Sequence, residues 1–130
     1  MNLVAQYTSS ISGEVLCPGD KSISQRALII GSLLNEDIEI SGFLNGDDPI
    51  STANALNAIG SCIKINGTSV SIKKRDIPFK DPSVNVDLGN SGTGMRLMMG
   101  LISSLGIKAT LVGDESLTKR PMLRVANPPK

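Results

Sequence analysis

Residues 18–26 place four side-chain donors in a pattern that could bind an anion. They read Pro-Gly-Asp-Lys-Ser-Ile-Ser-Gln-Arg and precede an apolar run, an order that predicts a loop leading into a helix. The first turn of a helix presents free backbone N–H groups and the positive end of the helix dipole. Lys21 and Arg26 add two positive charges there, and Ser22 and Ser24 add hydroxyl donors. This combination indicates a site for phosphate or carboxylate groups.

A plain helix cap would also explain this stretch. Asp20 or Ser22 could be the N-cap residue, and the charges of Lys21 and Arg26 would then lie in solvent. The nucleotide-binding P-loop is excluded, because Asp20 separates Gly19 from Lys21 and the Gly-Lys pair of that motif is missing. The cap and the anion site both remain open on this stretch alone.

A second loop, residues 89–94, reads Gly-Asn-Ser-Gly-Thr-Gly. This glycine order differs from the Gly-x-Gly-x-x-Gly of dinucleotide-binding proteins, which excludes that class. The glycines let a ligand approach the backbone closely, and Asn90, Ser91 and Thr93 supply polar donors. A glycine-rich turn with a Ser or Thr cap is the simpler alternative.

The two loops belong to an internal repeat. Gly19 and Gly89 stand 70 residues apart in the sequence, and so do Arg26 and Arg96. Each loop precedes an apolar helix, a short strand and a Gly-Asp turn before the next helix start. Self-similarity at this long period indicates duplicated modules, and two copies of an anion-type loop indicate one shared cleft.

A third polar cluster lies at residues 113–122. Lys119 and Arg120 stand just before Pro121, so they can occupy the loop before a further helix. Arginine suits a planar carboxylate because its guanidinium donates two parallel hydrogen bonds. The alternative is a pair of solvated charges.

Hydrophobic spacing predicts an α/β (α+β) protein. Alternating apolar residues predict strands at 11–17, 38–40, 63–65, 70–72, 84–88 and 109–112. Helical spacing predicts helices at about 22–34, 49–59 and 97–105. Asp48 is the expected N-cap of the second helix, with Pro49 first in it, and Asn66-Gly67 predicts a tight hairpin. The order is strand, loop, helix, strand, helix and hairpin, followed by a second, incomplete copy.

The composition excludes several functions. With 130 residues the chain can bury one modest core, and its net charge of +1 favours neither nucleic acid nor an anionic membrane. The chain has no His, the usual general base and commonest metal ligand, so no metal site is expected. No apolar run approaches membrane-spanning length, and the N-terminus lacks a signal-peptide pattern. Cys17 and Cys62 are expected to be reduced and mostly buried, as in a cytoplasmic protein.

Together, the three loops resemble the enolpyruvyl transferase family over about residues 15–127. The signatures that carry the likeness lie at residues 18–26, 88–96 and 113–122. Members that act on shikimate 3-phosphate are the most similar, since the sibling that acts on a UDP-sugar lacks the Asp-Lys-Ser-Ile-Ser form of the first loop. Gln25 stands where many members have His or Asn, and Gly94 where many have Ala. Neither departure is expected to touch a ligand.

The resemblance implies a two-domain fold in which each domain repeats a βαβαββ module three times. Residues 1–17 would belong to the other domain, residues 18–82 would form a first module, and residues 83–130 would form a second, incomplete one. Members of the family are several times longer than this chain. The chain is therefore expected to be an N-terminal fragment.

The resemblance also implies a reaction. The enolpyruvyl group of phosphoenolpyruvate moves to the 5-hydroxyl of shikimate 3-phosphate, a step of aromatic amino acid synthesis, and phosphate leaves. Addition and elimination pass through a tetrahedral intermediate without metal or organic cofactor. The chain offers no His and no convincing carboxylate pair for the proton transfers, so it is expected to be inactive without the remainder of the enzyme. The alternatives are a fragment of the UDP-N-acetylglucosamine enolpyruvyl transferase, a non-catalytic module that binds phosphorylated metabolites, and a purely structural repeat.

Three residues of the first loop match positions of the family that contact substrates. Lys21 would be catalytic and would bridge the two substrates near the phosphate of phosphoenolpyruvate. Ser22 and Arg26 would hold shikimate 3-phosphate, Arg26 through the carboxylate of that substrate.

Four residues of the later loops match positions near phosphoenolpyruvate. Asn90 and Gly92 would lie beside this substrate, with Thr93 nearby. Arg120 would pair with one of its anionic groups. In this family the herbicide glyphosate occupies the same place, so the space at Gly92 is expected to decide how well glyphosate binds.

Overall fold

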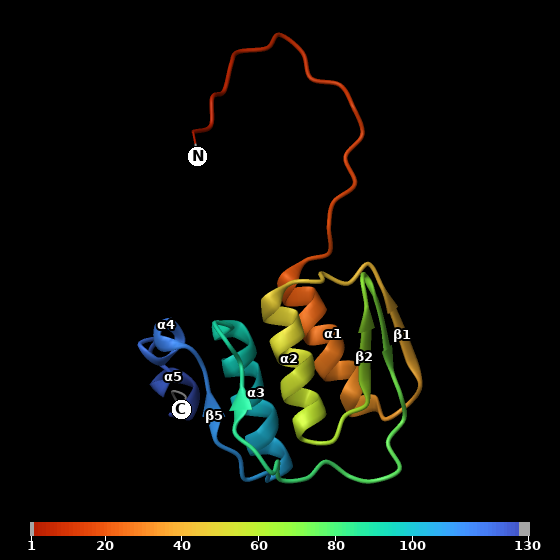
Figure 1. Ribbon diagram of the computed structural model, residues 1–130, viewed down its shortest axis with the longest axis vertical. Helices are drawn as coiled ribbons and strands as arrows, with labels where there is room; N and C mark the ends of the chain where they lie inside the picture. Colours follow the sequence, from red (N-terminus) through yellow and green to blue (C-terminus); the bar gives the residue numbers. More distant parts are fainter. Residues whose placement is uncertain (1, 128–130) are drawn as a thin grey trace.

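The computed structural model describes residues 2–127, which form five helices and five strands (Figure 1). The helices are α1 (Lys21–Leu34), α2 (Asp47–Ala58), α3 (Gly92–Leu105), α4 (Glu115–Thr118) and α5 (Leu123–Ala126). The strands are β1 (Ile38–Ser41), β2 (Ile63–Asn66), β3 (Ser69–Ile72), β4 (Val86–Asp87) and β5 (Leu111–Val112). The mixed α/β class expected from the hydrophobic spacing is confirmed.

The first sheet is built around the expected hairpin. Strands β2 and β3 pair antiparallel across Asn66-Gly67, and β1 pairs antiparallel with the other side of β3. Gly67 has a φ of +57°, a conformation that glycine adopts at little cost. Val70 and Ile72 are buried while Ser69 is exposed, so alternate residues of β3 face the core.

Helices α1 and α2 pack together against the buried face of this sheet (Figure 1). Leu28 of α1, Leu56 of α2 and Ile59 after it have no exposed surface. A Cβ added at Gly31 would lie 2.6 Å from Cδ1 of Ile72, which shows how closely α1 approaches β3. The absence of a side chain at Gly31 therefore sets the distance between the helix layer and the sheet.

The part of the chain that follows the hairpin contains a parallel pair of strands. Strands β4 and β5 pair in register Val86 to Leu111, and α3 connects them. Helix α3 buries Met95 and Met98 and packs beside α2, so that α2 lies between α1 and α3 (Figure 1). Gly106 ends α3 in the left-handed conformation with a φ of +68°, which glycine adopts at little cost.

The strand expected at residues 11–17 is wrong. Residues 2–20 form no helix or strand and extend away from the helices (Figure 1), and Leu16 is 91% exposed. A strand needs the backbone of a neighbour for its hydrogen bonds, and the described residues offer none alongside this segment. Cys17 and Cys62 are both exposed, so their expected burial is also wrong.

The expected helix starts also need correction. Helix α2 begins at Asp47 after Gly46, so Asp48 lies inside its first turn and is not the cap. Pro49 is tolerated there because the first N–H groups of a helix have no partner within the helix. Helix α3 begins five residues earlier than expected, at Gly92, because the hydroxyl of Ser91 caps it.

Within the described part of the chain, no helix is long and apolar enough to cross a membrane.

Leu56→Ala should destabilise the fold by about 2–5 kcal/mol, because it removes a fully buried side chain and leaves a cavity. Urea unfolding followed by circular dichroism measures this change. Asn54→Ala is the matched control, since Asn54 lies on the exposed face of the same helix. An equal loss for both variants would contradict the packing of α2 described above.

Candidate anion-binding site

Helices α1, α2 and α3 begin at the same end of the molecule (Figure 1). Asp20 caps α1 by accepting a hydrogen bond of 2.8 Å from the backbone N–H of Ile23. Ser91 caps α3 by accepting one of 3.1 Å from the N–H of Gly94. Three helix dipoles therefore point their positive ends toward one region.

Lys21 links the starts of α1 and α2. Its Nζ lies 3.0 Å from Oδ2 of Asp48, and its side chain is 51% exposed. The simple cap reading is thus half right: Asp20 is the cap, but Lys21 is paired instead of solvated. Because half of the Lys21 side chain is exposed, its Nζ could reach an anion bound at this end of the molecule. The ion pair with Asp48 holds the Nζ near the starts of α1 and α2.

Arg26 and Arg96 repeat the same local contact in the two copies. Each donates a 3.1 Å hydrogen bond from Nη1 to the backbone oxygen four residues earlier, Ser22 in one case and Gly92 in the other. The two arginines that stand 70 residues apart thus make the same local contact. Arg26 is exposed and Arg96 is half-buried.

Ser24 does not serve as an anion donor. It is 5% exposed, and its hydroxyl accepts a hydrogen bond of 3.0 Å from the backbone N–H of Leu44. The loop after β1 thereby lies against the first loop, and a Cβ at Gly19 would come within 2.2 Å of the backbone oxygen of Gly42. The expected donor role of Ser24 is corrected to one of holding two loops together.

Asn90 is held between the second and third clusters. Its Nδ2 donates to Oδ2 of Asp114 at 2.6 Å, and its Oδ1 accepts from Nη2 of Arg120 at 2.6 Å. Asp114 also caps α4 by accepting from the N–H of Leu117. The hydrogen bond from Asn90, then that from Leu117, and the charge of Arg120 lower the pKa of Asp114 below its ordinary value of 3.8.

Two guanidinium groups converge on Gly92. A Cβ at this position would lie 2.7 Å from Nη1 of Arg120 and 3.2 Å from Nη1 of Arg96. Thr93 follows in the first turn of α3 and is half-buried. The structure thus brings Gly92, Thr93 and Arg120 together with Asn90, as the sequence predicts, and adds Arg96, whose position the repeat had already marked.

The arginines of this region carry their charge without a carboxylate partner. Every ion pair within residues 2–127 has a lysine as its cation. Arg26, Arg96 and Arg120 instead donate to uncharged oxygens. Positive charge that forms no ion pair with a carboxylate favours a multiply charged anion.

Gln25 joins the three helix starts beneath the loops. It has no exposed surface, and its Nε2 lies 2.7 Å from Oγ of Ser91, 2.9 Å from Oγ1 of Thr52 and 3.3 Å from the backbone oxygen of Asp48. A Cβ at Gly94 would lie 3.1 Å from the same nitrogen. The two positions at which the sequence departs from the family pattern therefore meet at one point.

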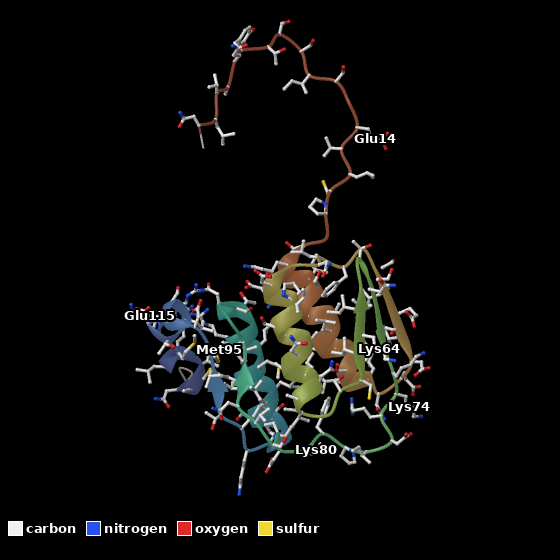
Figure 2. The ribbon with its side chains drawn as sticks, viewed as in Figure 1. Glu14, Lys64, Lys74, Lys80, Met95 and Glu115 are labelled. Atoms are coloured by element: carbon white, nitrogen blue, oxygen red, sulfur yellow. The ribbon has the colours of Figure 1, made fainter. Side chains whose placement is uncertain are left out.

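A separate cavity of about 560 Å³ lies between α3, β5 and α4. Met95, labelled in Figure 2, lines it together with Leu111 and Leu117, and no charged residue does so. Such a lining does not suit a phosphate or a carboxylate. No group of His, Cys, Asp and Glu within residues 2–127 could hold a metal ion.

Fold and site together define an α/β unit that concentrates positive charge at shared helix starts, a class suited to anionic metabolites. Residues 5–129 match the family described as EPSP synthase (3-phosphoshikimate 1-carboxyvinyltransferase). The chain therefore belongs to the EPSP synthase family.

Individual relatives agree with this membership. The chain is 47% identical over 126 residues to a 3-phosphoshikimate 1-carboxyvinyltransferase of Ruthia magnifica and 45% identical over 130 residues to one of Petrotoga mobilis. These alignments cover 96% and 98% of this chain but 29% and 30% of the relatives. A solved EPSP synthase from Acinetobacter baumannii superposes with a TM-score of 0.82 at 36% identity, over 89% of this chain and 26% of that one. The chain thus spans less than a third of the length of the relatives it matches.

Asp114→Asn should loosen Asn90, because the carboxylate oxygen that accepts from its amide becomes an NH2 group. The variant keeps an oxygen that can still cap α4. The side-chain amide signals of Asn90 and the guanidinium signals of Arg120 report the change by nuclear magnetic resonance. Asp76→Asn, at an exposed carboxylate, is the control.

The same link has a defined pH dependence. The pKa of Asp114 is lower in the folded chain than its ordinary value of 3.8. The Asp114 carboxylate therefore stabilises the folded state fully above pH 3.8, and this stabilisation is lost as the pH falls through the lower pKa of the folded chain. If the side-chain amide signals of Asn90 change neither in Asp114→Asn nor at low pH, the hydrogen bond between Asn90 and Asp114 is contradicted.

Proposed function

We propose that this chain supplies substrate-binding loops of a 3-phosphoshikimate 1-carboxyvinyltransferase. The enzyme would move the enolpyruvyl group of phosphoenolpyruvate to the 5-hydroxyl of shikimate 3-phosphate and release phosphate. The observation that carries the proposal is the meeting of Arg96 and Arg120 at Gly92, beside a second loop with Lys21 and Arg26. Two adjacent cationic loops suit two anionic substrates that must react with each other.

The α1 loop would bind shikimate 3-phosphate. Arg26 is exposed and can pair with the carboxylate of this substrate through two parallel hydrogen bonds. Ser22 lies in the first turn and can offer its hydroxyl together with the backbone N–H groups of the helix start. Lys21 would turn from Asp48 toward the phosphate of phosphoenolpyruvate, between the two substrates.

The α3 loop would bind phosphoenolpyruvate. Gly92 lets this substrate lie against the backbone, and Thr93 supplies a hydroxyl in the same turn. Arg120 and Arg96 would stabilise the charge on the substrate and on the phosphate as it leaves. Asn90, held by its two hydrogen bonds, keeps Arg120 in place before the substrate arrives.

Proton transfer would come from residues outside this chain. Three carboxylates beside the loops are already engaged: Asp20 caps α1, Asp48 pairs with Lys21, and Asp114 accepts from Asn90. The lowered pKa of Asp114 makes it a poor proton acceptor at neutral pH. The chain by itself should therefore bind substrates but release no phosphate from them, and steady phosphate release by the purified chain would contradict this.

Lys21→Met and Arg26→Ala, made in a complete enzyme that carries this sequence, should abolish turnover and leave the fold intact. Removing a charged contact to a ligand costs about 2–5 kcal/mol of binding. Isothermal titration calorimetry with shikimate 3-phosphate and a phosphate-release assay measure the two effects. Lys64→Met is the control, because Lys64 lies on the sheet away from the helix starts (Figure 2). Near-normal turnover and KM in either variant would refute the proposed function.

Gly92→Ala should reduce inhibition by glyphosate far more than it raises KM for phosphoenolpyruvate. The added methyl group would press on Arg120 and Arg96 and shorten the space at the loop. Glyphosate is longer than phosphoenolpyruvate, and close-packed sites tolerate an added methyl poorly, at about 1–3 kcal/mol. The inhibition constant and KM of the complete enzyme test this. If the inhibition constant for glyphosate and KM for phosphoenolpyruvate rise equally, or if neither rises, Gly92 does not lie beside the ligand.

A further inference from the structure

We propose that Gln25 is a positioning residue that fixes the phosphoenolpyruvate loop at the start of α3 relative to the shikimate 3-phosphate loop at the start of α1. This inference rests on the proposed function for the identity of the two substrates. The claim that α1 positions the start of α3 depends only on the hydrogen bonds of Gln25, whatever the substrates are.

The amide of Gln25 connects elements that are far apart in the sequence. Gln25 lies in α1 directly before Arg26, Thr52 lies in α2, and Ser91 caps α3. One buried NH2 group reaches both hydroxyl oxygens, at 2.9 Å and 2.7 Å. Loss of the NH2 group of Gln25 would remove this hydrogen bond between the starts of α1 and α3.

The contact with Ser91 acts on the substrate loop itself. The hydroxyl oxygen that accepts from Gln25 also accepts from the N–H of Gly94 at 3.1 Å, which makes it the cap of α3. The position of this oxygen sets where the first turn begins, and with it where Asn90 and Gly92 lie. Gln25 therefore acts on the ligand-facing residues through Ser91 and does not touch the substrate.

Packing alone does not explain a glutamine at this place. Its Oε1 is buried and has no hydrogen-bond partner within the described residues. A buried acceptor without a partner is unfavourable, and an apolar side chain of equal length would avoid that penalty. The amide is better explained by the two hydroxyls that its nitrogen holds.

The absence of a side chain at Gly94 leaves room for the hydrogen bonds of Gln25 with Ser91 and Thr52. A Cβ there would lie 2.7 Å from Oγ of Ser91 and 2.8 Å from Oγ1 of Thr52, both closer than real Cβ atoms approach. A side chain at residue 94 would have to displace the hydroxyls that Gln25 binds. The glycine and the glutamine are therefore parts of one arrangement.

The test uses three variants of a complete enzyme that carries this sequence. Gln25→Met keeps the length of the side chain and removes the donor. Gln25→His keeps a ring N–H donor and serves as the rescue. Ser32→Ala is the structural control, because it removes another buried hydrogen bond of α1, the 2.7 Å contact with Ser61 two turns further along.

Gln25→Met should raise KM for phosphoenolpyruvate about tenfold, the factor expected for one lost hydrogen bond, and change KM for shikimate 3-phosphate less than about twofold. Gln25→His should restore KM for phosphoenolpyruvate to near the wild-type value. Ser32→Ala should lower the melting temperature and leave both KM values unchanged. Unchanged KM values in Gln25→Met, or equal rises for both substrates, would overturn the proposal.

Amide hydrogen exchange separates this proposal from the proposed function. Exchange at residues 91–95 should be faster in Gln25→Met and normal in Gln25→His, whether or not the protein turns over these substrates. A wild-type enzyme without activity would refute the function, while faster exchange would still support the positioning role. If Gln25→Met does not fold, Thr52→Val removes the α2 acceptor that helps to orient the Gln25 amide toward Ser91. This variant should raise KM for phosphoenolpyruvate more than KM for shikimate 3-phosphate, and equal changes in both would overturn the proposal.

Discussion

The structure depends on how the positive ends of three parallel helices, which begin side by side, are stabilised. Each start exposes unpaired N–H groups and the positive end of a dipole, and adjacent positive ends repel one another. Asp20 and Ser91 cap two of the starts, and the third carries Asp47 and Asp48 in its first turn. The amide of Gln25 then ties the three starts together from below. The arginines beside these starts form no ion pair within the described residues, and this end of the molecule is therefore the candidate anion site.

The repeat explains why there are two such loops. In each helix, an arginine of the second turn donates to the backbone carbonyl four residues earlier. The two copies differ at the first strand, because β4 pairs with β5 in the second copy and residues 11–17 pair with nothing in the first. Each of the two loops thus brings cationic side chains to the same end of the molecule.

The sequence marked most of the polar residues that gather at the helix starts, because the motifs combine charge, glycine and helix-start signals. Arg96 was the residue to add, and only the repeat pointed to it. Ser24 and Asp48 were both misassigned: Ser24 is buried and accepts from the backbone N–H of Leu44, and Asp48 pairs with Lys21 instead of capping its helix. Sequence spacing describes where a side chain starts along an element, and it does not describe which neighbour from another element meets it.

The sequence by itself determined the local structure and the chemistry of the loops. Helical spacing, the Asn66-Gly67 turn and the stop at Gly106 act within a few residues, so their effects can be read without knowing the fold. Tertiary structure alone decided which polar residues are exposed at the helix starts and which hold the helices together. Gln25 and Arg26 are adjacent polar residues of one helix, yet one is fully buried and the other exposed. Their difference depends on hydroxyls contributed by α2 and α3, and only folding brings those groups within hydrogen-bonding distance.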